Sequence, residues 1–259
     1  MSSLSIRVPR EDFENLKFEL LGLGFCEREV LGALWSLSDG NTHLVLYPSG
    51  TLLLQGKYKE DIKELIFSRL KVPQRVMVGC DESGKGDVFG PLLLCCAVIK
   101  PEYYRKVLEL NPRDCKKMKD EEVVEKAKAL RSFCELRCRC VEPLELNLMW
   151  EQVGNLNRVL DKLYGEILKE LEESYPSADF FVDAYSARNP FGGRVVFKPK
   201  GEENLSVAVA SVLARAGFLE WLDAQGLPKG SSPDSLSLAR ALYQKDPEGA
   251  KKLLKTFFL

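Results

Sequence analysis

Histidine is almost missing from this sequence: His43 is the single one among 259 residues. Nucleophilic catalysis that depends on a Ser–His or Cys–His pair would have to use that residue. His43 lies in an apolar run that follows an Asp39-Gly40 turn, a pattern typical of an ordinary strand. The sequence therefore argues against histidine-based chemistry and leaves carboxylates and metal ions as the catalytic groups.

The sequence also lacks an excess of charge of either sign. Its net charge is −1, so the composition does not indicate a protein that binds polyanions. No apolar run approaches the length of a transmembrane helix, and the N-terminus has no basic region followed by an apolar stretch. We expect a soluble, unexported, cytoplasmic protein that acts as a monomer without contact to a membrane.

Cysteine is present, but not in a pattern typical of disulfides or zinc. The eight cysteines are scattered, and Cys95 and Cys96 are adjacent within an apolar run, which favours small buried residues over a disulfide framework. Cys134, Cys138 and Cys140 lack a second pair that is spaced to complete a zinc site. The sequence therefore gives little support to structural zinc.

The pattern of apolar residues divides the chain near residue 72 into a domain at 1–70 and a second domain at 74–259. The first has a β-α-β-β-β-α order, which implies a small curved antiparallel sheet backed by two helices. In the second, strands and helices alternate, which favours an α/β layered domain. The predicted strands are 5–8, 32–37, 42–47, 51–55, 76–80, 91–99, 133–141, 179–183 and 194–198, and the predicted helices are 9–23, 59–70, 121–131, 155–174, 204–222, 234–244 and 247–257.

Two adjacent carboxylates, Asp81 and Glu82, are the most informative feature of the chain. They follow a short apolar run and precede a glycine-bracketed Lys85, which predicts a turn between two strands. Like charges side by side repel each other, and a divalent cation held by their oxygens would compensate for that repulsion. A solvated acidic turn is the alternative interpretation of this segment alone.

Further acidic residues fit the metal interpretation. Asp183 ends an apolar run that has the pattern of an interior strand, where a charge is costly without a cation partner. Glu202 and Glu203 precede a long apolar helix, although acidic residues also stabilise a helix start through the macrodipole. Carboxylates from three separated segments would converge on two divalent cations, as in enzymes that cleave phosphodiesters.

A nucleotide-binding loop is a competing interpretation of residues 79–85. Their Gly-x-x-x-x-Gly-Lys spacing matches most of a Walker A loop. However, Gly86 replaces the Ser or Thr that would reach Mg²⁺, and the two carboxylates inside the loop would face the phosphates. The pattern therefore argues against nucleoside triphosphate hydrolysis.

Residues 81–91, Asp-Glu-Ser-Gly-Lys-Gly-Asp-Val-Phe-Gly-Pro, resemble the first motif of the type 2 ribonucleases H. Their Asp-x-Phe-Gly-Pro ending resembles the bacterial HIII subclass more than HII. Other family motifs resemble segments in the same order along the chain: 114–120 (with Cys115 in place of Ser), 181–183, 208–215 and 227–230. The resemblance covers the chain from about 76 to 257.

The sequence departs from the family pattern at the fourth carboxylate. Lys200-Gly201 points to Glu202, but the spacing from Glu202 to Ser211 is one residue shorter than in the family. We infer a one-residue deletion after the carboxylate and prefer Glu202 over Glu203.

The resemblance implies a ribonuclease H-like domain, with a mixed sheet flanked by helices, preceded by a small α+β domain like the TATA-box-binding protein. It implies endonucleolytic cleavage of the RNA strand of RNA/DNA hybrids by two-metal-ion hydrolysis, which leaves 3′-hydroxyl and 5′-phosphate ends. The implied cofactors are two Mg²⁺ or Mn²⁺ ions. The implied catalytic and metal-binding residues are Asp81, Glu82, Asp183 and Glu202.

Discrimination of RNA from DNA depends on the 2′-hydroxyl in the minor groove, which a backbone without Cβ can approach closely. We therefore expect the hybrid to contact Ser83, Gly84, Lys85, Gly86 and the basic Lys116. Two alternatives remain: cleavage at single ribonucleotides embedded in duplex DNA, as in HII enzymes, and hybrid binding without catalysis.

Overall fold

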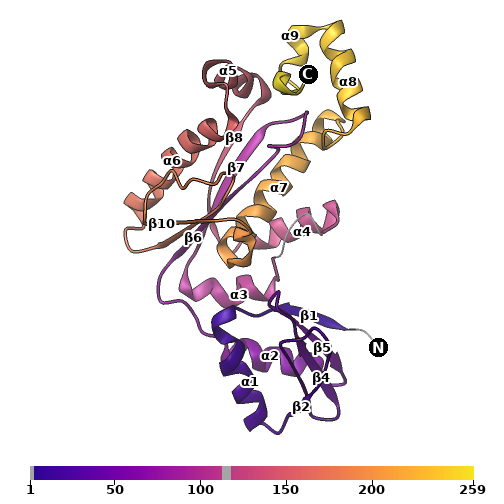
Figure 1. The fold of residues 1–259 in the computed structure, drawn as a ribbon, viewed down its shortest axis with the longest axis vertical. Coiled ribbons are helices and arrows are strands. Elements are labelled where there is room, and N and C mark those ends of the chain that lie inside the picture. The colour runs from indigo at the N-terminus through magenta and orange to yellow at the C-terminus, as the bar shows by residue number, and fades with distance from the viewer. Residues whose placement is uncertain (1–2, 113–117) are drawn as a thin grey trace. The chain divides into compact units, whose positions relative to one another are not determined.

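The computed structural model describes residues 3–112 and 118–259, and for Glu202 it describes the backbone alone. The chain folds as two compact units (Figure 1). The first extends to Pro73 and includes Tyr104–Asn111, whereas the second comprises Gln74–Tyr103 and Pro112–Leu259. Lys116 lies outside the described residues.

A five-stranded antiparallel sheet with the strand order β1-β5-β4-β3-β2 forms the first unit. Its inward-facing leucines, such as Leu44 and Leu54, are completely buried, so the alternating pattern of the sequence has produced one apolar face. The predicted strand at 32–37 is wrong at its start: the observed strand begins at Trp35, and a separate edge strand, Cys26–Arg28, precedes it in the chain. The elements are β1 (Leu4–Arg7), α1 (Phe13–Gly22), β2 (Cys26–Arg28), β3 (Trp35–Ser38), β4 (Thr42–Leu46), β5 (Thr51–Gly56) and α2 (Lys59–Arg69).

Helix α3 (Tyr104–Glu109) belongs to the first unit although it follows β7 in the chain. The Arg105 guanidinium donates hydrogen bonds to the carbonyl oxygens of Ser68 (3.1 Å) and Leu70 (3.2 Å). The amide of Asn111 donates to the carbonyl oxygen of Ser5 at 3.2 Å. The predicted division of the chain into domains 1–70 and 74–259 therefore assigns this helix to the wrong domain. The helix is too short for its apolar pattern to show which sheet it packs against.

The second unit contains a mixed sheet with the strand order β10-β9-β6-β7-β8. Strands β6, β7 and β8 pair in antiparallel fashion, whereas β9 runs parallel to β6 and β10 parallel to β9. These strands are β6 (Met77–Ser83), β7 (Leu92–Ile99), β8 (Glu135–Val141), β9 (Asp179–Asp183) and β10 (Val195–Lys198). This is the mixed sheet flanked by helices that the resemblance implied.

Two long helices cover the central strands of this sheet. The apolar stripe of α6 (Leu156–Ser174) packs with Val78, Cys80 and Phe180 in one core cluster. Helix α7 (Leu205–Gln225) lies against the other face, where Gly79 allows the approach because a Cβ there would lie 2.2 Å from the Ser206 carbonyl carbon. The remaining helices are α4 (Asp120–Leu130), α5 (Pro143–Val153), α8 (Pro233–Lys245) and α9 (Pro247–Ala250).

Helix α7 corrects one expectation drawn from the sequence. Its 21 residues are long and apolar enough to cross a membrane. Most of them are buried within the unit, and those at its N-terminal half, such as Val209 and Val212, are completely enclosed. The apolar run that the sequence interpretation overlooked is that of a core helix.

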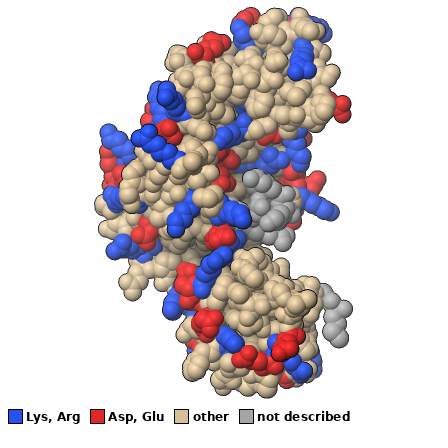
Figure 2. Space-filling model, viewed as in Figure 1, with Lys and Arg blue, Asp and Glu red and all other residues tan. Residues whose placement is uncertain are grey.

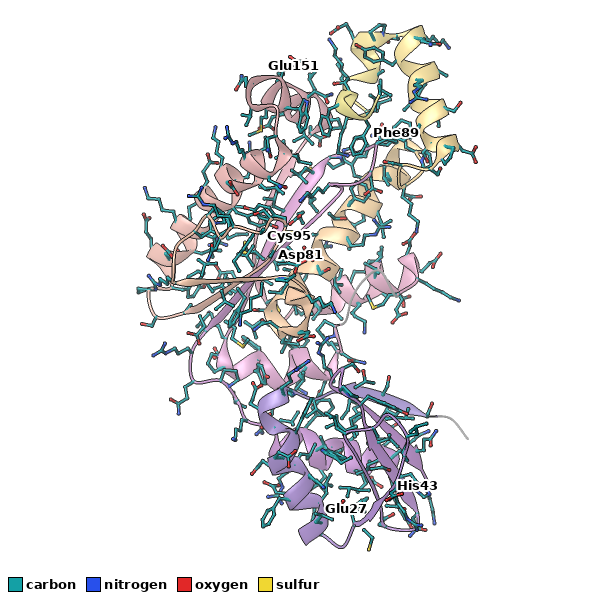
Figure 3. All side chains as sticks on the ribbon, in the orientation of Figure 1. Glu27, His43, Asp81, Phe89, Cys95 and Glu151 are labelled. Atoms are coloured by element: carbon teal, nitrogen blue, oxygen red, sulfur yellow. A yellow bond between two sulfur atoms is a disulfide. The ribbon has the colours of Figure 1, made fainter. Side chains whose placement is uncertain are left out.

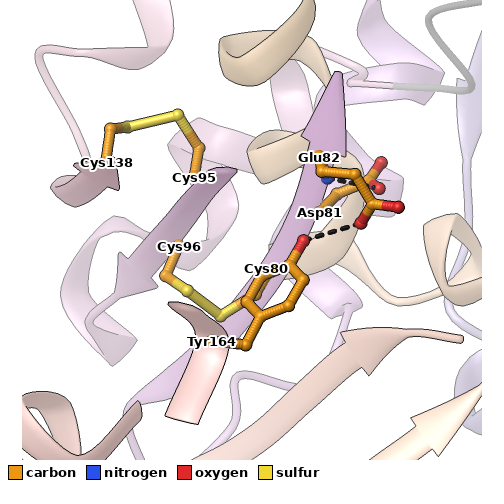
Figure 4. Close-up of a disulfide and its surroundings, with 7 residues drawn as sticks. All are labelled: Cys80, Asp81, Glu82, Cys95, Cys96, Cys138 and Tyr164. Atoms are coloured by element: carbon orange, nitrogen blue, oxygen red, sulfur yellow. Dashed lines mark hydrogen bonds between the residues drawn. A yellow bond between two sulfur atoms is a disulfide. The ribbon is translucent and has the colours of Figure 1, made fainter. Parts of the chain in front are cut away.

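The expectation of unpaired cysteines is wrong for four residues (Figure 4). Disulfides join Cys80 to Cys96 and Cys95 to Cys138. Each joins residues that are register partners on neighbouring antiparallel strands, and the adjacent Cys95 and Cys96 use opposite faces of the sheet. Spacing along the chain cannot show such pairing across strands. The bond at Cys138 also removes it from any zinc site.

Reduction of the two disulfides is expected to lower the free energy of unfolding by about 2–4 kcal/mol per bond, because each bond restricts the unfolded chain. Denaturant unfolding of oxidised and reduced protein measures the difference. The double variant Cys95→Ala/Cys138→Ala should reproduce the part due to one bond without reductant. Identical midpoints for oxidised and reduced protein would contradict this prediction.

Candidate active site

Asp81 lies near the end of β6 on the face that α7 covers. It is the register partner of Cys95, and its carboxylate makes a hydrogen bond with the Ser211 side chain of α7. Burial, reinforced by the charges of Glu82 and Asp183, raises the pKa of Asp81 to about 8. The expected turn at this position is wrong: both carboxylates belong to a strand, which holds them more rigidly than a turn would.

Glu82 points to the opposite face of the same strand, because side chains alternate along β6. The hydroxyl of Tyr164 on α6 donates a hydrogen bond to Glu82 Oε2 at 2.8 Å (Figure 4). Tyr164 is completely buried and stacks on Tyr185 with ring centroids 5.6 Å apart. Tyr164 thereby fixes the carboxylate of Glu82, and sequence analysis missed it because it lies within an otherwise aliphatic helical stripe.

Asp183 ends β9, the strand next to β6 in the sheet. Its Oδ1 atom accepts a hydrogen bond from the backbone N–H of Gly201 at 2.7 Å. A Cβ on Gly201 would lie 2.9 Å from the Asp183 Cα, so a side chain at position 201 would force the two segments apart. The glycine therefore brings the 201–203 segment against Asp183.

Asp81, Glu82 and Asp183 line one pocket of about 540 Å³ in the second unit. The sequence predicted that carboxylates from three separated segments converge, and the structure brings those of two segments, 81–82 and 183, to this pocket. Figure 3 places Asp81 within the sheet of this unit and His43 on β4 of the first unit. The other residues of the pocket are Ser83, Gly84, Lys85, Gly86, Asp87, Met118, Asp120, Ser211, Arg215 and Lys229.

The two candidates for the fourth carboxylate follow Gly201 in a single 3₁₀ turn, Gly201–Glu203. Glu203 is exposed and lines a different pocket, beside Phe181 and Val207. The side chain of Glu202 lies outside what the structure describes. The exclusion of Glu203 from the pocket of Asp81 agrees with the preference for Glu202 and leaves that assignment a prediction.

The donor set of the pocket fits a hard divalent cation. Three carboxylates are close enough for Glu82 and Asp183 to raise the pKa of Asp81, a repulsion that a cation would relieve. Among the side chains that the structure describes, no three His, Cys, Asp or Glu residues are gathered closely enough to hold an ion alone. Mg²⁺ is typically bound through one or two carboxylates together with substrate phosphates and water, so this open arrangement suits it.

Lys85 is directed towards α6 and the end of β9. Its Nζ atom donates to Asn157 Oδ1 at 3.1 Å and lies 5.2 Å from the centre of the Tyr185 ring. It also lies 4.0 Å from Glu82 Oε1. These contacts place a positive charge at the rim of the carboxylate pocket.

Two basic residues of the pocket were not identified as site residues from the sequence. Arg215 lies 3.8 Å from Asp120, and Lys229 also forms an ion pair with Asp120. Both belong to segments that resemble family motifs, but their chemistry alone did not distinguish them from surface charges. Figure 2 shows Lys and Arg intermixed with Asp and Glu on the face in view. Arg215 and Lys229 bring positive charge to the pocket itself.

The two glycines beside Lys85 have different environments. Gly84 adopts φ +89°, and a Cβ there would lie 2.1 Å from the carbonyl oxygen of Pro91 and 2.8 Å from the Phe218 ring. Gly86 has no described atom within 4 Å of such a Cβ. Gly84 is therefore required by the packing of the protein itself, whereas the space beside Gly86 is open to a substrate.

We expect Gly84→Ala to destabilise the protein by about 1–3 kcal/mol, because alanine is strained at this φ and has no room. Gly86→Ala is the matched control for folding: it should keep the wild-type melting temperature and raise KM for a hybrid. Thermal unfolding and steady-state kinetics of the two variants test this contrast. Equal melting temperatures, or an unchanged KM for Gly86→Ala, would contradict it.

Known proteins are similar to this chain in both sequence and fold. A family model described as Ribonuclease HII matches residues 78–237. Ribonuclease HIII of Aquifex aeolicus (strain VF5) is 35% identical over 255 residues, covering 96% of this chain and 98% of that protein. Ribonuclease HIII of Chlamydia pneumoniae is 29% identical, covering 94% and 92%.

Solved structures agree with these sequence relatives. The crystal structure of Aquifex aeolicus RNase H3 has a TM-score of 0.64 at 33% identity, covering 99% of this chain and 100% of that one. The crystal structure of Bst-RNase HIII in complex with Mn²⁺ has a TM-score of 0.66 at 23% identity, covering 99% and 96%. The second likeness shows a common fold.

Proposed function

The chain belongs to the type 2 ribonucleases H, in the ribonuclease HIII subclass, and on this premise we propose that it hydrolyses the RNA strand of RNA/DNA hybrids internally, with divalent cations and the carboxylates of the β6–β9 pocket. The convergence of Asp81, Glu82 and Asp183 on one pocket is the observation that carries the proposal. The enzyme class follows from the family, and the residues, metal ions and product ends are the proposed part.

Each carboxylate has a distinct role in this proposal. Asp81 is the central ligand, because the charges of both Glu82 and Asp183 act on its carboxylate. Glu82 is held in orientation by Tyr164, and Asp183 by the N–H of Gly201. Glu202 follows Gly201 directly and would complete the set. The ring of Tyr185 packs between Tyr164 and Phe197, which favours a structural role for it.

The chemistry that two Mg²⁺ or Mn²⁺ ions supply in such a site is activation of water and stabilisation of the leaving oxygen. Bst-RNase HIII was solved in complex with Mn²⁺, which supports a divalent ion here. In the proposed hydrolysis a water oxygen bonds to phosphorus and the bond from phosphorus to the 3′ oxygen breaks, while the water gives up a proton to the solvent and the 3′ oxygen takes one up. The products are a 3′-hydroxyl and a 5′-phosphate. The protein contributes the positions of its carboxylates and the positive charge of Lys85 at the rim.

Substrate choice separates this proposal from cleavage at single embedded ribonucleotides. A loop that contacts 2′-hydroxyls on neighbouring nucleotides requires a run of ribonucleotides. In HII enzymes a tyrosine stacks on the deoxyribose at the RNA–DNA junction, and Tyr185, two residues after Asp183, is the candidate for that role here. Its packing within an aromatic cluster argues against such stacking.

We expect a continuous hybrid to be cleaved at least about tenfold faster than a DNA duplex with one ribonucleotide, since one 2′-hydroxyl offers only part of the contacts. The measurement is kcat/KM on the two substrates with equal sequence and length. Comparable values would show that the enzyme uses the junction. Binding of hybrid without cleavage of either substrate would indicate a protein that binds but does not catalyse.

A further inference from the structure

Lys255 has no exposed surface, and it belongs to a part of the chain that the proposed reaction does not use. Its relative exposure is 0%. Its Nζ atom donates hydrogen bonds to the carbonyl oxygens of Asp87 (2.8 Å) and Phe89 (3.0 Å) and lies 5.9 Å from the centre of the Phe218 ring. Burying an ammonium group is costly, so an apolar side chain would fill this space at lower cost if filling were its only purpose.

Both acceptors of Lys255 belong to residues 84–90, which we call the glycine loop. Its first four residues, 84–87, line the carboxylate pocket. Residues 252–256, which we call the C-terminal segment, pair with the rest of the glycine loop backbone to backbone. The N–H of Lys255 donates to Val88 O at 2.8 Å, and the N–H of Gly90 donates to Leu253 O at 2.9 Å. The loop is therefore held along one side by the last residues of the chain.

The C-terminal segment is itself fixed by Asn147 of α5. The Asn147 amide donates to Leu254 O at 2.9 Å, and its Oδ1 accepts from the N–H of Thr256 at 2.9 Å. Asn147 is almost completely buried, so these bonds are shielded from water. Lys255 thus projects from an anchored backbone, which gives its ammonium group a defined position.

On its other side the glycine loop is bound to residues 229–231, of which Lys229 lines the pocket. Asp87 Oδ1 accepts from the N–H of Gly230 at 2.6 Å, the N–H of Val88 donates to Gly230 O at 3.2 Å, and the Ser231 hydroxyl donates to Gly86 O at 2.8 Å. The loop is clamped between two segments that are distant from it in sequence. Lys255 contributes the single side chain of the C-terminal segment that bonds to loop carbonyls within the described residues.

We infer that Lys255 is a positioning residue, which holds the glycine loop in the conformation that binds the RNA strand of the hybrid. The inference rests on the proposed function, because it assigns the loop the role of contacting substrate. Without the amino group of Lys255, the carbonyl oxygens of Asp87 and Phe89 lose this donor, and the buried one at Phe89 is left unsatisfied unless the loop shifts to reach water. A shift of about 1 Å in a substrate-positioning loop is enough to weaken productive binding by an order of magnitude or more.

The test compares Lys255→Met, which keeps the length of the side chain and removes its donors, with Lys252→Met on the exposed neighbour of the same segment. Lys255→Met should raise KM for the hybrid roughly 10-fold, with kcat within about twofold of wild type, and should speed hydrogen exchange at the amides of residues 86–90. Lys252→Met should leave the exchange unchanged. Wild-type KM in a folded Lys255→Met protein whose loop exchanges faster would overturn the inference.

A second variant serves if Lys255→Met does not fold. Ser231→Ala removes the hydroxyl bond to Gly86 O on the opposite side of the loop without changing a residue that lines the pocket, and it should raise KM with little change in kcat. A wild-type KM for Ser231→Ala would show that the loop position does not set binding. If wild-type protein does not bind or cleave hybrid at all, the proposed function fails, whereas faster loop exchange in Lys255→Met would still show the clamp.

Discussion

Asp81→Asn is expected to reduce hybrid cleavage by at least about three orders of magnitude, while the dissociation constant for the hybrid stays within a few fold of wild type. The substitution removes the central anionic ligand but leaves the glycine loop and its contacts in place. Single-turnover cleavage and a binding titration on the same hybrid measure the two quantities. Asp179→Asn is the control. Asp179 lies at the start of β9, at the opposite end of that strand from Asp183, in an exposed ion pair with Arg75.

The same variant has a second readout that does not depend on activity. The pKa of Asp81 is raised to about 8 in the folded protein from an ordinary value of 3.8. Between these values the folded state binds more protons than the unfolded state, so stability falls as pH rises from about 4 to about 8. Metal-free wild type should show this loss, and metal-free Asp81→Asn should show less of it. Residual cleavage near the wild-type rate, or equal pH dependence of unfolding, would contradict the role of Asp81.

Glu202→Gln and Glu203→Gln are expected to differ by orders of magnitude in cleavage rate, because a glutamine amide binds a hard cation poorly and only one of the two glutamates belongs to the site. We expect Glu202→Gln to lose activity and Glu203→Gln to keep it, since Glu203 lines a pocket apart from Asp81. Titration of each variant with Mn²⁺ provides a readout independent of turnover.

The two glutamates serve as controls for each other, because they are adjacent and carry the same change. Loss of activity in Glu203→Gln alone would move the fourth carboxylate by one residue and reject the inferred deletion. Equal activity of both variants would show that three carboxylates suffice.

The sequence predicted the convergence of the carboxylates better than it predicted the local structure around them. Asp81, Glu82 and Asp183 were identified because adjacent or strand-terminal carboxylates need an electrostatic partner. That requirement can be recognised from the order of residues along the chain. The same segment was predicted as a turn, whereas β6 continues to Ser83, because pairing with β7 overrides the turn preference of its polar residues.

What escaped prediction depends on partners far apart in the chain. The disulfide between Cys95 and Cys138 follows from strand register, the bond of Tyr164 to Glu82 from the packing of α6, and the clamp at Lys255 from the position of the C-terminal segment. Gly84 illustrates a subtler case. It was expected to contact the substrate, and the structure shows in addition that the Pro91 carbonyl and the Phe218 ring leave no room for a side chain at this position. Nothing in the sequence around Tyr164 or Lys255 indicates that the first would bond to Glu82 or that the second would bond to the glycine loop.

The most direct test of the account is cleavage of a continuous RNA/DNA hybrid, labelled on the RNA strand, by wild-type protein with Mg²⁺, with Mn²⁺ and with excess chelator. The account predicts internal cuts in the RNA strand with either ion, 3′-hydroxyl and 5′-phosphate ends on the fragments, and no cleavage with chelator. Cleavage that survives chelation, or fragments that end in a 3′-phosphate or a 2′,3′-cyclic phosphate, would contradict hydrolysis at a carboxylate-held metal site.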